Sequence, residues 1–120
     1  MINVLVVEDD AIARSVICAI IKSGGYNAME ADGGESALQI CENANVKIDL
    51  ILTDFKMPNM NGVELIKRLR IDHADMRAVL MSGFANDTVD TEGGKMTNLL
   101  FMRKPFLPQE LLTMIRTALS

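Results

Sequence analysis

Five short runs of apolar, largely β-branched residues divide the chain, and polar residues or glycines follow each one. The runs are Ile2–Val7, Tyr26–Ala31, Asp49–Thr53, Ala78–Met81 and Leu99–Met102. Runs of this length are typical of strands, and nearly continuous apolar character is typical of strands buried on both faces of a parallel sheet. The pattern therefore predicts five strands.

Between these runs, apolar residues recur every three or four positions, as they do along one face of a helix. The four clear patterns are Ile12, Val16 and Ile20; Ala37, Leu38 and Cys41; Val63, Ile66 and Leu69; and Leu111, Leu112, Ile115 and Leu119. Gly24-Gly25 is expected to end the first helix, and Pro108 fits the first turn of the last. Residues 85–98 are poor in helix formers and contain Gly93-Gly94, so we expect a short or mobile helix there.

Strands that alternate with helices predict an α/β protein whose parallel sheet carries helices on both faces. We therefore expect a doubly wound, five-stranded parallel sheet with five helices. The length of 120 residues suits a single domain covering residues 1–120. A hydrophobic content of 49% is sufficient for a core on each side of the sheet.

Composition and charge exclude several classes of protein. The net charge of −4, from 12 basic and 16 acidic residues, argues against a surface that binds nucleic acid directly. No apolar run approaches the roughly 18 residues of a membrane span, and the first residues lack the shape of a signal peptide. Cys18 and Cys41 have no ligand spacing, so we expect buried, reduced thiols in a cytoplasmic protein without a membrane partner.

Charged and hydroxyl side chains follow four of the five predicted strands. Glu8-Asp9-Asp10 follows the first strand, Asp54 the third, Ser82 the fourth and Lys104 the fifth. In a doubly wound sheet the carboxyl ends of these strands border one crevice, which is where open α/β sheets bind ligands. We therefore expect these groups to converge.

The charges of these groups indicate their chemistry. Carboxylates of Glu8, Asp9 and Asp54 in one pocket would repel each other by roughly 3 kcal/mol per pair at ~5 Å and an effective dielectric of about 20. A hard divalent cation such as Mg²⁺ would relieve this repulsion, since carboxylate and carbonyl oxygens are its preferred ligands. Lys104 and Ser82 would complete a cage for a tetrahedral dianion on one carboxylate, and an aspartate can accept a phosphoryl group.

Over its whole length, the chain resembles a response-regulator receiver domain of two-component signalling. The matching segments are Val4–Asp10, Asp54–Gly62, Leu80–Ala85 and Arg103–Phe106. Each segment is a weak signal alone, but the four in this order, each at a strand end, are specific. The resemblance implies a flavodoxin-like fold, like that of chemotaxis regulators, with the strand order 2-1-3-4-5.

The resemblance also implies a role for each matching residue. Asp54 would be the phosphoryl acceptor, and Ser82 and Lys104 would bind the phosphoryl oxygens. Glu8 and Asp9 would hold magnesium directly or through water. The full set of metal ligands would be Glu8, Asp9, Asp54 and the backbone carbonyl of Lys56. Asp10, by contrast, is better explained as the N-cap of the first helix.

Four further residues occupy positions that the family uses for switching or tuning. Phe101 lies at the aromatic switch position, although it could equally be a core residue, and Pro105 at the position of the family's cis proline. Lys56, two residues after Asp54, could contact the phosphoryl group or hinder the attacking water. Phe84 is bulky and apolar, so it should exclude water.

The resemblance implies a phosphoacceptor module of a two-component phosphorelay. A histidine kinase or a histidine phosphotransfer protein would phosphorylate Asp54 in a Mg²⁺-dependent reaction. The face formed by helix 4, strand 5 and helix 5 would then signal to an unidentified output protein. Such a protein is not an enzyme in the usual sense, since it catalyses only its own phosphoryl transfer and autodephosphorylation.

Two alternatives remain open. The chain could be the receiver module of a larger hybrid kinase or regulator, although its start at Met1 favours a stand-alone protein. It could also be a Mg²⁺-dependent phosphohydrolase with an aspartyl nucleophile. Such enzymes usually carry a second acid two residues after the nucleophile, where this chain has Lys56.

Overall fold

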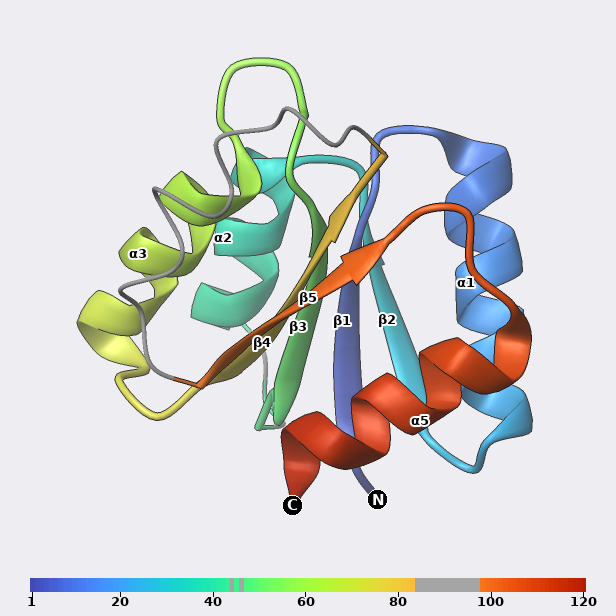
Figure 1. Ribbon diagram of the computed structural model, residues 1–120. Coiled ribbons are helices and arrows are strands. Elements are labelled where there is room, and N and C mark those ends of the chain that lie inside the picture. The colour runs from blue at the N-terminus through green and yellow to red at the C-terminus, as the bar shows by residue number, and fades with distance from the viewer. Residues whose placement is uncertain (44, 46, 84–97) are drawn as a thin grey trace.

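A computed structural model describes residues 1–43, 45, 47–83 and 98–120 of the chain. Its centre is a parallel sheet of five strands in the order β2-β1-β3-β4-β5 (Figure 1). The strands are β1 (Asn3–Val7), β2 (Asn27–Ala31), β3 (Leu50–Asp54), β4 (Arg77–Ser82) and β5 (Leu99–Arg103). The predicted sheet and its strand order are therefore confirmed.

Helices cover both faces of this sheet. They are α1 (Ala11–Ser23), α2 (Gly34–Asn43), α3 (Gly62–Asp72) and α5 (Pro108–Leu119). α1 and α5 pack on one face, and α2 and α3 pack on the other (Figure 1). The short helix expected within residues 85–98 falls on residues 84–97, which lie outside the described part of the chain.

Each face of the sheet has its own hydrophobic core, because successive strand residues point to opposite sides. Leu5 and Ile51 pack with α2 and α3, whereas Val4, Leu50 and Leu52 pack with α1 and α5. All five side chains are fully buried. Burial of one such side chain stabilises the fold by about 1.5–3 kcal/mol, which explains the apolar residues on both faces of the central strands.

α1 is present as predicted, but two of the three apolar residues that indicated it do not lie on its buried face. Ile12 is 78% exposed and Val16 is 55% exposed. The buried residues of the helix are Ile17, Cys18 and Ile21. Two apolar stripes run along this helix, so a period of 3.6 residues reveals the helix but not which stripe faces the sheet.

The helix ends follow the predicted local signals. Asp10 is the N-cap of α1, where its Oδ1 accepts hydrogen bonds from the backbone N–H groups of Ile12 and Ala13 at 2.9 and 3.3 Å. Gly24 is the C-cap of the same helix, and Pro108 is the first residue of α5.

Cys18 and Cys41 are free and buried, as expected. Within the described ranges, no helix is long and apolar enough to cross a membrane.

β3 includes Asp54 as its last residue, one position beyond the predicted run, and β4 likewise ends on Ser82. Asp54 and Ser82 therefore belong to the strands and not to the loops that follow them.

Candidate functional site

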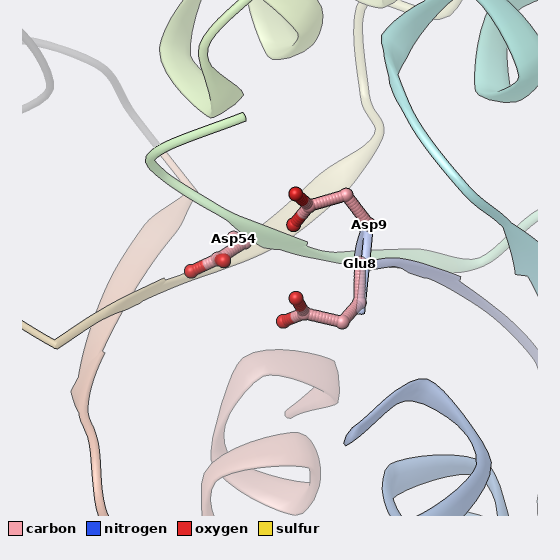
Figure 2. Close-up of side chains that lie close together, drawn as sticks. All are labelled: Glu8, Asp9 and Asp54. Carbon is pink, nitrogen blue, oxygen red and sulfur yellow. The ribbon is translucent and has the colours of Figure 1, made fainter. Parts of the chain in front are cut away.

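Three acidic residues meet at the carboxyl edge of the sheet. Glu8 and Asp9 directly follow β1, and Asp54 ends the neighbouring strand β3. One carboxylate oxygen from each lies within 4.8 Å of the other two, and Figure 2 shows the three groups projecting to the same side. The expected convergence of these carboxylates is therefore observed.

Glu8 is a buried carboxylate, with only 2% of its surface exposed. Its Oε2 accepts a hydrogen bond from Lys104 Nζ at 2.9 Å. Its Oε1 accepts a bond from the backbone N–H of Asp10 at 3.2 Å. A buried charge is costly unless it is paired and hydrogen-bonded, and these two contacts meet that requirement.

Lys104 joins two of the acidic residues. Its Nζ lies 3.2 Å from Asp54 Oδ1, in addition to the contact with Glu8. The backbone N–H of Lys104 donates to the carbonyl of Ser82 at 2.8 Å, so the residues that end β4 and follow β5 lie side by side. The peptide bond between Lys104 and Pro105 is cis, as the resemblance implied.

The buried setting of Asp54 changes its acidity. Its side chain is 13% exposed, and loss of hydration raises its pKa from 3.8 to about 6. The ammonium group of Lys104 opposes this rise, whereas the charges of Glu8 and Asp9 add to it. Burial alone would lower the pKa of Lys104, but its bonds to Glu8 and Asp54 outweigh burial and raise it.

The donor set fits a hard divalent cation. Among the described residues, the carboxylates of Glu8, Asp9 and Asp54 lie together, and the ammonium group of Lys104 contacts two of them, Glu8 and Asp54. Carboxylate oxygens are the ligands that Mg²⁺ prefers, and Glu8, Asp9 and Asp54 supply one each within reach of a common point.

The loop after Asp54 is held against the sheet. The backbone N–H of Phe55 donates to the carbonyl of Met81 at 2.8 Å, and that of Gly62 donates to the carbonyl of Phe55 at 2.8 Å. Residue 62 must be glycine, because a Cβ there would collide with the backbone oxygen of Asp54. Lys56 is an exposed residue of this loop, and the metal-binding role of its carbonyl stays a prediction.

Phe101 and Pro105, two of the four residues predicted to switch or tune the site, lie on β5 and shortly after it. Phe101 is exposed beside a groove of about 600 Å³ between β5 and α5. The groove is lined by Leu100, Phe101, Met102, Arg103, Phe106, Gln109, Glu110, Thr113, Met114 and Thr117. Phe84 lies outside the described residues. The roles of these residues and of Ser82 and Pro105 stay predictions.

Sequence reasoning missed Arg14, which contacts the backbone beside the acidic cluster. Its Nη1 donates a hydrogen bond to the backbone carbonyl of Glu8 at 2.7 Å, and its Nε lies 3.2 Å from Glu30 Oε1. An arginine on a polar helix position has no distinguishing pattern. Only the fold, which places α1 beside β2, brings Arg14, Glu8 and Glu30 together.

Comparison with known proteins places this geometry in context. Residues 4–116 match the family described as the response regulator receiver domain. The sensor kinase CckA of Brucella abortus is 33% identical over 118 residues, which is 98% of this chain and 12% of the kinase. The sporulation initiation phosphotransferase F of Bacillus subtilis is 28% identical over 104 residues, which is 87% of this chain and 82% of that protein.

The similarity extends to solved structures. The chemotaxis protein CheY4 of Vibrio cholerae is 26% identical and has a TM-score of 0.88, with 98% of each chain covered. The chain thus spans nearly all of one small signalling protein but only 12% of the sensor kinase.

Proposed function

The chain belongs to the response regulator receiver domain family, and on this premise we propose that Asp54 is the residue on which it accepts a phosphoryl group. The donor would be the phosphohistidine of a histidine kinase or of a histidine phosphotransfer protein. Residues 1–120 would form one receiver domain, working in the cytoplasm and turning over no separate substrate. It would not contact nucleic acid or membrane itself.

One observation carries this proposal. The oxygens of Glu8, Asp9 and Asp54 approach within 4.8 Å of one another, and Lys104 Nζ lies 3.2 Å from Asp54 Oδ1. A nucleophilic carboxylate thus lies among groups that can neutralise the charge of an incoming phosphoryl group. Phosphoryl transfer depends mainly on such positioning and charge neutralisation.

In the transfer step, an oxygen of the Asp54 carboxylate attacks the phosphorus atom. A P–O bond forms while the P–N bond to the donor imidazole breaks, and the imidazole keeps the electron pair and takes up a proton. Lys104 would bind one phosphoryl oxygen with its ammonium group, and the Ser82 hydroxyl would donate to another. Since Asp54 attacks as the anion, the reaction needs it deprotonated.

Glu8, Asp9 and Asp54 would hold Mg²⁺, together with the backbone carbonyl of Lys56. When bound, the cation supplies positive charge that offsets the charge of the phosphoryl group. Glu8 contributes a carboxylate whose position is fixed by burial and by its bond to Lys104. Asp9 is exposed and therefore faces the side from which a cation arrives.

Phosphorylation would be reported through β5 and α5 to an output protein. Lys104 follows β5 directly, so a change in its contacts acts at the end of the strand that carries Phe101. Phe101 is exposed next to the groove between β5 and α5, where a change of its rotamer would alter the surface offered to a partner. Lys56 and Phe84 would tune the lifetime of the phosphoryl group.

Mass spectrometry of the intact protein tests the central proposal. Incubation with Mg²⁺ and acetyl phosphate should add one phosphoryl group to the wild-type protein. Asp54→Asn should gain none, whereas Asp75→Asn, a matched change at an exposed position far from the site, should react like the wild type. Modification of Asp54→Asn at the wild-type rate would contradict the assignment.

A second candidate is the receiver module of a larger hybrid kinase. The 33% identity to the sensor kinase CckA over 98% of this chain favours it. An antibody raised against the purified chain distinguishes the two forms in extracts of the source cells. A stand-alone receiver would migrate near 13.2 kDa, and a hybrid kinase would be several times larger.

A further inference from the structure

We propose that Arg14 is a positioning residue that holds the peptide between Glu8 and Asp9 in the geometry required for cation binding. This inference rests on the proposed function, since it concerns the same acidic site. Arg14 lies on α1 and does not belong to the three carboxylates that would bind the cation. It acts on the backbone that carries two of them.

Two contacts fix the Arg14 side chain. Its Nη1 donates to the Glu8 carbonyl at 2.7 Å, and its Nε lies 3.2 Å from Glu30 Oε1. A guanidinium group is planar and rigid, so two contacts through different nitrogens determine its orientation. The side chain is 18% exposed, and the bond to the carbonyl is short, as charge-assisted bonds are.

The Glu8–Asp9 peptide depends on this contact because β1 ends just before it. The backbone N–H of Glu8 still donates to the β2 carbonyl of Ala31 at 3.1 Å, as the last bond of the strand pair. The Glu8 carbonyl points instead to Arg14, which is itself held by Glu30 on β2. β2 therefore fixes both backbone groups of Glu8. It binds the N–H directly through Ala31, and it holds the carbonyl indirectly through Glu30 and Arg14.

This arrangement matters most for Asp9. Asp9 is exposed, whereas Glu8 is buried and bonded to Lys104. The direction of the Asp9 side chain consequently depends on the orientation of its own backbone, which the Glu8 carbonyl defines. Groups that orient metal ligands typically change metal affinity by 10- to 100-fold when they are removed.

Arg14 also carries a positive charge near the acidic cluster, and this allows a sharp test. If Arg14 acted only through its charge, its removal would strengthen cation binding, because a repelling cation would be lost. If Arg14 positions the peptide, its removal weakens binding. The two roles predict opposite signs.

Isothermal titration with MgCl₂ measures the effect in the unphosphorylated protein. Arg14→Gln should raise the Kd for Mg²⁺ by about tenfold. Arg14→Lys keeps the charge but cannot make both contacts, so its Kd should lie between those of the wild type and Arg14→Gln. Glu30→Ala removes the anchor of Arg14 and should raise the Kd by a smaller factor.

Arg77→Gln is the matched control. Arg77 Nη1 donates to the carbonyl of Leu119 at 2.6 Å, so this variant loses a similar bond at the opposite edge of the sheet. Its Kd for Mg²⁺ should equal that of the wild type. In phosphorylation by acetyl phosphate, Arg14→Gln should require more Mg²⁺ for half-maximal rate while its rate at saturating Mg²⁺ stays near the wild-type value.

An unchanged or lower Kd in Arg14→Gln would overturn the proposal, as would an equal rise in Arg77→Gln. If Arg14→Gln does not fold, as judged by circular dichroism, Arg14→Lys and Glu30→Ala decide the matter by the same measurement. A wild-type protein that binds no Mg²⁺ would instead remove the proposed function and this inference with it.

Discussion

Lys104 Nζ lies 3.2 Å from Asp54 Oδ1, although β4 lies between their strands. Asp54 ends β3 and Lys104 follows β5, so the lysine side chain crosses the end of β4 to reach the carboxylate. It supplies the positive charge that partly offsets the burial of Asp54. The acidity of Asp54 should therefore depend on residue 104.

Replacement of Lys104 by methionine should raise the pKa of Asp54 further above its present value of about 6. Loss of a neighbouring opposite charge typically shifts a carboxyl pKa by about 1–3 pH units. A carbon-detected NMR titration of the side-chain carboxyl groups, in the absence of divalent cations, measures the change. Lys67→Met, at an exposed position on α3, should leave the Asp54 titration where it is.

Asp54→Asn should stabilise the protein at neutral pH. The folded-state pKa of Asp54, about 6, exceeds its ordinary value of 3.8, so ionisation of this group costs stability as pH rises from about 4 to above 6. The variant should gain roughly 2–3 kcal/mol at pH 7.5 and almost nothing at pH 4. Urea unfolding with EDTA at both pH values measures this difference.

Asp75→Asn, an exposed change, is the control for that experiment and should show no such dependence on pH. An Asp54→Asn variant that is less stable than the wild type at pH 7.5 would contradict the buried, ionised carboxylate described above.

Divalent cations should raise the melting temperature of the protein, because a ligand that binds only the folded state stabilises it. At a Mg²⁺ concentration of ten times the Kd, the stabilisation is about 1.4 kcal/mol. Asp9→Asn should lose most of this effect. Asp10→Asn should retain it, since asparagine preserves the N-cap of α1 and Asp10 is not one of the clustered carboxylates. Differential scanning calorimetry with and without MgCl₂ distinguishes the two neighbours.

Gly62→Ala should both destabilise the fold and slow phosphorylation. The added Cβ would meet the backbone oxygen of Asp54 and lie 2.6 Å from Leu80 Cδ1, so the end of β3 must shift. Overpacking of this kind costs about 1–3 kcal/mol. Gly33→Ala has open space for its Cβ and should be nearly neutral. Denaturant unfolding and acetyl phosphate kinetics are measured on both variants. Equal stability and equal phosphorylation rates in Gly62→Ala and Gly33→Ala would show that the close approach of residue 62 to Asp54 is unimportant.

Lys56→Ala should shorten the lifetime of the phosphoryl group. A lysine two residues after Asp54 can contact the phosphoryl group or hinder the attacking water, and alanine can do neither. A phosphate-release assay on the phosphorylated protein measures the rate, which should increase several-fold. Lys47→Ala, an exposed lysine at the opposite edge of the sheet, should not change it.

The sheet was predictable from sequence because its signals are local. Val4 to Val7 form an uninterrupted apolar run, and only a strand between two cores accounts for it. The position of Asp54 followed from the same logic, since the ends of parallel strands meet at one edge. Even the N-cap role of Asp10 could be inferred from its place before the first helix.

Features that depend on side-chain direction could not be predicted in this way. The stripe of Ile12 and Val16 has the same period as the buried stripe of α1, so sequence alone cannot decide which one faces the sheet. Arg14 belongs to no periodic apolar pattern, and its contact with Glu30 depends on where the fold places β2. The bond between Lys104 and Glu8 depends on the packed positions of β1 and β5, which lie three places apart in the sheet.

The contact between Glu8 and Lys104 joins residues 96 positions apart, so it can form only in a chain that extends past β5. A chain that a ribosome has extended only through β4 already carries all three carboxylates but lacks the ammonium group that pairs with two of them. A chain that a protease has cut before β5 is in the same condition. Neither fragment contains Lys104, so neither can form these two contacts, and the charge pairing of the site arises only after β5 has been made.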